Sequence, residues 1–243
     1  MGIMGRLSRA TDDGLVYHAM NRGNNRADVF AGDGDHEAFL ESLRVAKGRY
    51  PFALFGYCLM SNHFHLLLKP GSGQSISRIL QSLSVAHTWR YHKRHRTSGH
   101  VWQGRFKSPV IQDDDHLLVV LRYIEANPVR ASMVADPRDY RWSSYGQHGL
   151  GLVDTLLDGF PEWEHLGPSE VERRRRWRAK LRSAQKQDEL TAVRDSLRTG
   201  RPLGSPAWVE GVATRLGIDL TPRPRGRPRK EESASVRGAR KMN

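Results

Sequence analysis

The sequence predicts an α+β fold in which an antiparallel sheet is built in the order strand, helix, strand, strand, helix, strand. Short runs that alternate in polarity, or that are rich in β-branched and aromatic residues, indicate the strands. Longer segments with apolar residues at helical spacing lie between them. Two apolar runs divided by only two polar residues indicate a central hairpin.

The first strand and the first helix come from the N-terminal part of the chain. Residues 15–21 (LVYHAMN) alternate well enough for a strand, and residues 22–25 (RGNN) form a polar, turn-rich loop after it. Asp35 can cap a helix that runs to about Gly48, because apolar residues recur on one of its faces.

The central hairpin determines which side chains share a face of the sheet. Ser61 and Asn62 form the expected turn, so Cys58 is expected opposite His65. The first face carries large apolar residues and is the expected core: Phe55, Tyr57, Leu59, Phe64, Leu66 and Leu68. The second face carries a mixed set: Gly56, Cys58, Met60, His63, His65 and Leu67.

A second helix and a fourth strand complete the predicted sheet. Ser75 begins a helix that ends near Arg94, and its apolar residues mark one face. Residues 106–112 predict a strand. Pro109 places that strand at the edge of the sheet, because proline has no N–H to donate to a neighbour.

A third helix follows this edge strand. Residues 113–115 are three aspartates that cap it and complement the positive end of its dipole. We expect it to stop at Asn127, because Pro128 disfavours helical geometry in the residue before it. The first six elements have the order of a ferredoxin-like sheet, to which this helix is an addition.

The remainder of the chain predicts a basic helical part and a tail. Three segments predict helices: 169–187, 188–198 and 205–216. Residues from 221 onward are too rich in proline, glycine and charge to fold alone, so a partly disordered C-terminal region is expected. The predicted organisation is a core domain, a connecting region, a basic helical region and a disordered basic tail, at 1–146, 147–168, 169–220 and 221–243.

The net charge is concentrated towards the C-terminus. The 243 residues contain 39 Lys and Arg against 26 Asp and Glu, a net charge of +13. Residues 1–169 carry +2 of this charge and residues 170–243 carry +11. Such an excess favours nucleic acid as the partner. A single cysteine excludes a disulfide scaffold, and the absence of an apolar segment at the start predicts a cytoplasmic protein.

His63 and His65 lie two residues apart on the second strand of the hairpin. They share a face on which Gly56 and Cys58 leave room, so the two imidazoles can bind one metal ion. Two hydrogen-bonded strand histidines would give the same pattern, and His-x-His alone favours that interpretation in a chain with 11 His.

Tyr123 and Asn127 follow on the third predicted helix. Their spacing of four residues places both on one side of the helix, at the border of its apolar stripe. Each alone is more typical of a packing tyrosine and of a helix-end asparagine. The combination with the histidine pair, and with Arg105 and Lys107 between the two motifs, favours a functional site.

These blocks together resemble the HUH endonucleases. Residues 60–67 (MSNHFHLL) match the His-hydrophobic-His signature of that superfamily. Residues 101–108 (VWQGRFKS) and 122–131 (RYIEANPVRA) resemble the other blocks of its single-tyrosine branch, with flanking blocks at 21–25 and 140–145. The region from 15 to 146 is similar to the REP-associated tyrosine transposases, bacterial proteins linked to repetitive extragenic palindromes.

The resemblance implies a role for each residue of the site. His63 and His65, with the side-chain oxygen of Asn127, would bind Mg²⁺ or Mn²⁺. Tyr123 would attack a phosphodiester of single-stranded DNA, leaving a 5′-phosphotyrosine and a free 3′-OH. Such an aryl phosphate diester stays reactive, so the 3′-OH can attack back, which suits strand transfer. Insertion-sequence relatives carry Gln where this chain has the shorter Asn127.

Cations and aromatic residues near these motifs are candidate DNA contacts. Arg105 and Lys107 are the first candidates for phosphate contacts, followed by Arg22 and Arg130. Each of these four could equally be an ordinary surface charge. Trp102 is a candidate for stacking on a base, whereas Trp89 is expected to pack.

The basic C-terminal part offers further candidates. Residues 173–182 would form a cationic helical surface. Residues 225–230 (RGRPRK) resemble an AT-hook, in which Arg225, Arg227 and Arg229 would enter a narrow minor groove. A generic basic tail would have the same composition.

The sequence thus predicts a metal-dependent endonuclease and transposase that cleaves and rejoins single-stranded DNA at hairpin-forming repeats. A non-catalytic protein that binds repeat DNA is one alternative, and a metal-dependent phosphoesterase that uses water in place of Tyr123 is another. The expected partners are single-stranded and hairpin DNA, with no membrane and no organic cofactor. We expect a nucleoid-associated monomer, with a dimer as the alternative.

Overall fold

A four-stranded antiparallel sheet lies at the centre of the computed structural model, which describes residues 13–221. The strands are β1 (Val16–Arg22), β2 (Phe52–Met60), β3 (His63–Pro70) and β4 (Val110–Ile111). Their spatial order is β2-β3-β1-β4, and every neighbouring pair is antiparallel. Arg225, Arg227 and Arg229 of the expected AT-hook lie outside the described residues.

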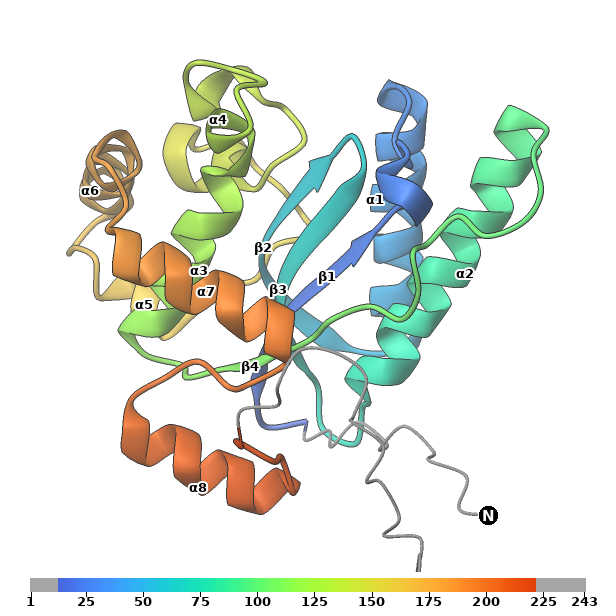
Figure 1. Cartoon of the computed structure of the whole chain (residues 1–243). Helices are drawn as coiled ribbons and strands as arrows, with labels where there is room; N and C mark the ends of the chain where they lie inside the picture. The colour runs from blue at the N-terminus through green and yellow to red at the C-terminus, as the bar shows by residue number, and fades with distance from the viewer. Residues whose placement is uncertain (1–12, 222–243) are drawn as a thin grey trace, which may run out of the picture.

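Helices cover both faces of the sheet (Figure 1). On one face lie α1 (Asp33–Arg49) and α2 (Ile76–His95), which bury the apolar side of the hairpin. On the other lies α3 (Asp115–Glu125). The predicted order of strand, helix, strand, strand, helix, strand with one added helix is therefore confirmed. In the part of the chain that the structure covers, no helix is both long and apolar enough to cross a membrane.

The hairpin has the predicted register, with one exception. Cys58 lies opposite His65 as expected. Phe55, however, packs on the α3 face, so its predicted place on the α1/α2 face is wrong. The cause is a β-bulge between Leu54 and Gly56, which inserts one residue and gives the predicted place of Phe55 to Leu54.

Gly56 allows α3 to approach the sheet closely. A Cβ atom at this position would lie 2.2 Å from Cδ1 of Leu121 on α3. The room that the sequence suggested beside the histidines is thus used by the packing of α3 against β2. A side chain at Gly56 would push α3 away from the sheet, and with it the residues that α3 carries.

The fourth strand is at the edge of the sheet, as predicted, but shorter than residues 106–112. Pro109 interrupts the ladder because it has no N–H, although its carbonyl still accepts from the His18 N–H at 3.0 Å. Lys107 forms a separate bridge with Met20. The outer side of β4 is covered in turn by Leu203, whose N–H donates to the Val110 carbonyl at 2.8 Å.

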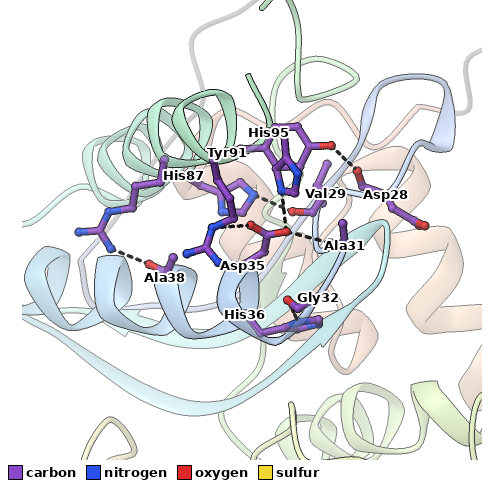
Figure 2. Close-up of polar contacts among 12 residues, drawn as sticks. Asp28, Val29, Ala31, Gly32, Asp35, His36, Ala38, His87, Tyr91 and His95 are labelled. Carbon is purple, nitrogen blue, oxygen red and sulfur yellow. Dashed lines mark hydrogen bonds and ion pairs between the residues drawn. The ribbon is translucent and has the colours of Figure 1, made fainter. Parts of the chain in front are cut away.

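The start of α1 differs from the prediction, because Gly32 and not Asp35 is the residue at the N-cap. Asp35 lies in the first turn and is buried. Its carboxylate accepts from the Ala31 N–H at 3.0 Å and from His95 at 2.9 Å, and it pairs with Arg94 at 3.3 Å (Figure 2). Asp35 therefore joins the start of α1 to the end of α2.

The third helix also ends differently. Asp114 caps it as predicted, accepting from the His116 N–H at 2.8 Å. The helix stops at Glu125, and Asn127 is the first residue of a separate turn, α4 (Asn127–Arg130). Pro128 is tolerated because the first turn of a helix does not need its N–H groups.

The C-terminal helices lie in the predicted segments, except that the first ends at Arg182 and not at residue 187. They are α6 (Glu170–Arg182), α7 (Gln187–Thr199) and α8 (Pro206–Leu216). The shorter helical elements are η1 (Asn24–Arg26), η2 (Pro137–Asp139), η3 (Gly146–Leu150) and α5 (Pro161–Glu164). Residues of α6 and α7 enter the same apolar cluster as α3: Trp177, Leu181, Val193 and Leu197. The basic helices thus pack on the core, while the expected domain boundaries stay a prediction.

Candidate active site

His63 and His65 project from β3 towards the face that α3 covers. Their ring centroids lie 5.0 Å apart, with the ring planes at 84°. Burial, followed by the charge of Arg22, lowers the pKa of His63 to about 4. Burial also holds the pKa of His65 well below its ordinary value. Both imidazoles are therefore neutral near pH 7, and a neutral imidazole has one free lone pair to offer a metal ion.

Tyr123 comes to these histidines from α3. Its ring centroid lies 5.8 Å from that of His65, edge to face. The guanidinium of Arg130 stacks 4.3 Å from the centre of the same ring and donates to the Tyr123 carbonyl. Burial lowers the pKa of Arg130 to about 10, which leaves it charged at neutral pH. The structure thus brings a phenol, two imidazoles and a cation together.

Asn127 lies four residues after Tyr123, at the start of α4. Its side-chain Nδ2 is buried and has no hydrogen-bond partner within the described part of the chain. A buried amide without a partner is costly, and an amide can turn its oxygen to the same point. Two neutral imidazoles and one amide oxygen fit a divalent cation. No group of three or more His, Cys, Asp or Glu between residues 13 and 221 is placed to bind one.

A third histidine that the sequence interpretation missed lies beside this site. His18 of β1 has its Nε2 2.9 Å from Nδ1 of His65, and its ring lies 5.9 Å from that of Tyr123. It is 1% exposed, and burial lowers its pKa to about 3. His18 lies two residues before Met20 on β1, so its side chain is on the α3 face of the sheet. The sequence alone could indicate this position only if the pairing of β1 with β3 were known.

Three of the four predicted phosphate contacts lie at the end of β1. Arg22 is directly opposite His63 in the register of the sheet. Together with Arg105 and Lys107 it borders a cavity of about 270 Å³. Burial lowers the pKa of Lys107, and the charges of Arg22 and Arg198 lower it further. Cations that disfavour one another in this way create a site for an anion.

Helix α7 adds two arginines that the sequence interpretation also missed. Arg194 lowers the pKa of Arg130, and Arg198 lowers that of Lys107. α7 lies against α3, so a helix of the C-terminal region brings cations to the site (Figure 1). No local motif marks these two arginines, because only the tertiary packing of α7 brings them here.

The two tryptophans differ in their surroundings. Trp102 is partly buried, lies edge to face on Phe64 at 5.5 Å, and donates to the Ser84 carbonyl at 3.2 Å. Trp89 was expected to pack but is 63% exposed on the outer face of α2. The ammonium group of Lys93 lies 5.0 Å from the centre of its ring. The packing prediction for Trp89 is wrong.

The arginine run of α6 is largely paired. Arg175 and Arg176 bind Glu172 at 2.7 and 2.8 Å, and Arg173 binds Glu170 at 2.8 Å. These pairs have the i,i+3 and i,i+4 spacing of a helix surface. The cationic surface expected from residues 173–182 is therefore weaker than its sequence suggests.

A buried carboxylate connects α6 to α3 between Tyr123 and Asn127. Glu125 is 0% exposed. It accepts hydrogen bonds from Ser144 at 2.5 Å, His148 at 2.6 Å and the Trp177 indole at 2.7 Å. Three donors, two from residues 144–148 and one from α6, thus fix α3 at a residue that lies between Tyr123 and Asn127.

A tyrosine, two histidines and an arginine on one face of this sheet are typical of a transposase-like site. The comparisons with known proteins agree with this class. The family described as "Transposase IS200 like" matches residues 11–127. Over this stretch, which is just under half of the chain, the protein is similar to that family.

Two relatives refine the comparison. A protein of Haemophilus influenzae described as a REP-associated tyrosine transposase is 31% identical over 118 residues, which cover 44% of this chain and 66% of that protein. A solved REP-associated tyrosine transposase, bound to a REP hairpin, has the same fold, with a TM-score of 0.52 and 18% identity. The match to that structure covers 65% of this chain and 93% of the other.

Proposed function

We propose that this protein is a metal-dependent endonuclease and strand transferase of single-stranded DNA that acts at hairpin-forming repeats. The observation that supports it best is the position of Tyr123. Its ring lies 5.8 Å from His65 and 4.3 Å from the Arg130 guanidinium, on the face that also presents His63. A tyrosine beside two neutral imidazoles and a cation suits attack on a phosphodiester.

In this proposal the phenolic oxygen of Tyr123 attacks the phosphorus, and the bond to the 3′-oxygen breaks. The products are a 5′-phosphotyrosine and a free 3′-OH, and the reverse attack by a 3′-OH rejoins DNA. Arg130 holds the tyrosine ring and supplies positive charge beside it. The tight packing of α3 against β2 at Gly56 keeps Tyr123 near the histidines.

His63, His65 and Asn127 would hold Mg²⁺ or Mn²⁺. A bound divalent cation would neutralise charge on the non-bridging phosphate oxygens. The neutral imidazoles and the unpartnered Asn127 amide support this assignment. Because imidazole ligands also suit Zn²⁺ and Ni²⁺, the choice of Mg²⁺ or Mn²⁺ rests on family resemblance.

Arg22, Arg105, Lys107 and Arg130 would bind phosphates on either side of the reacting one. The relative of similar fold that is bound to a REP hairpin supports hairpin DNA as the partner. Trp102 lies close to these cations, at the border of a cavity that also contains Arg105. The candidates for binding duplex DNA next to the cleaved strand are Arg225, Arg227 and Arg229.

A covalent-adduct assay tests the proposal. The full chain is incubated with end-labelled hairpin oligonucleotides and Mg²⁺ or Mn²⁺, and the products are separated on a denaturing gel. We expect a protein–DNA adduct that requires the metal and is absent in Tyr123→Phe. Tyr91→Phe is a matched control, because this tyrosine of α2 lies on the other side of the sheet.

The two alternatives give different results in this assay. Cleavage that persists without adduct in Tyr123→Phe would indicate a phosphoesterase that uses water. Tight binding of the hairpin without cleavage in any metal would indicate a repeat-binding protein without catalytic activity.

A further inference from the structure

We infer that a cavity on the α2 face of the sheet binds one unpaired base of the DNA strand that enters the active site. This inference rests on the proposed function, because it places the substrate strand next to the same catalytic residues. The cavity has a volume of about 400 Å³, which suits a single nucleotide. It lies between α2, the end of β1 and the loop that precedes β4.

The cavity is built from one face of α2 and from the loop that precedes β4. Ser77, Gln81, Ser84 and Val85 line it at helical spacing. Trp102 forms part of the opposite side, where its ring is fixed by its contact with Phe64 and by its bond to the Ser84 carbonyl. A fixed aromatic ring beside polar side chains is the arrangement that binds unstacked bases.

Two polar side chains of α2, Ser84 and Gln81, line the cavity. The Ser84 hydroxyl is buried and has no hydrogen-bond partner among the residues that the structure describes. A buried hydroxyl without a partner is costly, so a ligand that supplies the partner gains affinity. Gln81 is exposed at the rim and carries both a donor and an acceptor, as the edge of a base requires.

The cavity continues into the cationic site beside the histidines. Asn21, Gly104 and Arg105 border both this cavity and the smaller one that contains Arg22 and Lys107. A base in the larger cavity would therefore place its phosphate near Arg105, at the edge of the sheet. The next phosphates would then lie towards Arg22, which is opposite His63 in the sheet.

The positive charge around the cavity favours a polyanion as its ligand. Residues 42–112 contain 11 Lys and Arg and no Asp or Glu. None of the residues that line either cavity is acidic. One turn beyond Val85, the exposed Trp89 with Lys93 above its ring offers a stacking surface for a second base.

A thermodynamic cycle between protein and DNA tests the inference. The probe is a DNA hairpin with single-stranded arms of about ten nucleotides, enriched for binding from a pool with random arms. All binding is measured in the Tyr123→Phe background, so that no strand is cleaved. An abasic site is placed at each arm position in turn. Binding is then compared between Tyr123→Phe alone and the same protein with Gln81→Ala and Val85→Ala.

We expect one arm position at which the abasic site weakens binding about fivefold or more, and at which the added substitutions remove most of that penalty. Val45→Ala is the control, because Val45 is an exposed valine of α1 that does not line the cavity. It should leave the penalty unchanged. Gln81 and Val85 are exposed, so their loss leaves the core intact.

The inference is overturned if no abasic position weakens binding, or if the penalty is the same in both proteins. Formation of the covalent adduct on the same oligonucleotide is measured separately, with the protein that retains Tyr123. A coupling without an adduct would support the cavity and reject the proposed reaction. An adduct without a coupling would support the reaction and reject the cavity.

Discussion

His18 determines which nitrogen of His65 can bind a ligand. The two rings share a hydrogen bond of 2.9 Å between Nε2 of His18 and Nδ1 of His65. If Nδ1 of His65 donates, its Nε2 keeps a free lone pair and can bind a cation. If Nδ1 accepts, Nε2 carries the proton and cannot. Binding of a metal ion by Nε2 of His65 therefore requires His18 to accept the hydrogen bond from Nδ1 of His65. A neighbour that accepts from a ligating histidine orients that ligand in the same way.

Replacing His18 should therefore raise the metal requirement of the reaction. In His18→Leu, the Mg²⁺ or Mn²⁺ concentration for half-maximal adduct should rise about 10- to 100-fold. His18→Gln, which keeps an acceptor, should recover part of the loss. His87 is a buried histidine on the other face, packed against Phe39, and His87→Gln should leave the requirement unchanged. An equal requirement in wild type and His18→Leu would show that His18 only packs.

Single residues could be predicted only where a local pattern marked them. His63, His65, Tyr123 and Asn127 belong to short motifs, and the structure brings the histidines and Tyr123 together. His18 has no motif of its own, because its role arises from the pairing of β1 with β3. Trp89 was misjudged because the exposure of a helical residue depends on what lies against that helix.

At the scale of elements, α3 is held from both sides. β2 approaches it at Gly56, and the C-terminal region binds it through Glu125 and through Arg122, which donates to the Ser183 carbonyl at 2.6 Å. Helical periodicity predicted the position of α3 and of the C-terminal helices. It could not predict that Trp177 of the arginine-rich helix would be fully buried against α3, because periodicity does not specify a partner.

Removing the Glu125 carboxylate should loosen α3. Glu125→Ala leaves three buried donors without an acceptor and should lower the free energy of unfolding by about 3 kcal/mol. Glu125→Gln, which keeps one acceptor, should lose less. Chemical denaturation measures the first effect, and faster amide hydrogen exchange in α3 would locate it. An exchange rate in α3 equal to that of wild type would contradict this role.

Truncation at two positions separates the packed helices from the tail. A chain ending at Gly167 lacks Trp177 and should form no adduct, because α3 loses much of its support. A chain ending at Thr221 keeps every described helix and should still form the adduct. Circular dichroism and the adduct assay compare the two chains. Adduct formation by the shorter chain would show that α3 holds its place without α6 and α7.

At the scale of the whole molecule, positive charge is concentrated in a second segment besides the C-terminal part. Residues 42–112 alone carry +11, as much as the whole C-terminal part, because the acidic residues of the first 169 lie outside that segment. The net charge of +2 over residues 1–169 does not reveal this basic segment. Four arginines of α6, at positions 173–176, are paired with glutamates, whereas Arg105 and Lys107 form no ion pair with any residue between 13 and 221. The folded core should thus contribute to DNA affinity.

The buried histidines should make the fold less stable in mild acid. Burial lowers the pKa of His87 from an ordinary 6.5 to about 4. Below pH 6.5 the unfolded chain binds a proton that the folded chain does not, so stability falls as the pH decreases towards 4. His87 alone should contribute a loss of ~2 kcal/mol between pH 6.5 and pH 5. Urea unfolding at both pH values measures it, and His87→Gln should reduce the pH dependence. An unchanged dependence in that variant would exclude His87 as its source.

The salt dependence of binding should divide between the tail and the core. Residues 222–243 contain eight Lys and Arg against two Glu. If they bind duplex DNA, deleting them should reduce the slope of log affinity against log salt by up to about 7. Arg105→Ala with Lys107→Ala should reduce it by about 1.4 more, because each contact with a single strand contributes ~0.7. Fluorescence anisotropy of a labelled hairpin at several salt concentrations measures both changes. A slope that is unaffected by the deletion would place the whole electrostatic contribution on the folded core, around the cations at the end of β1.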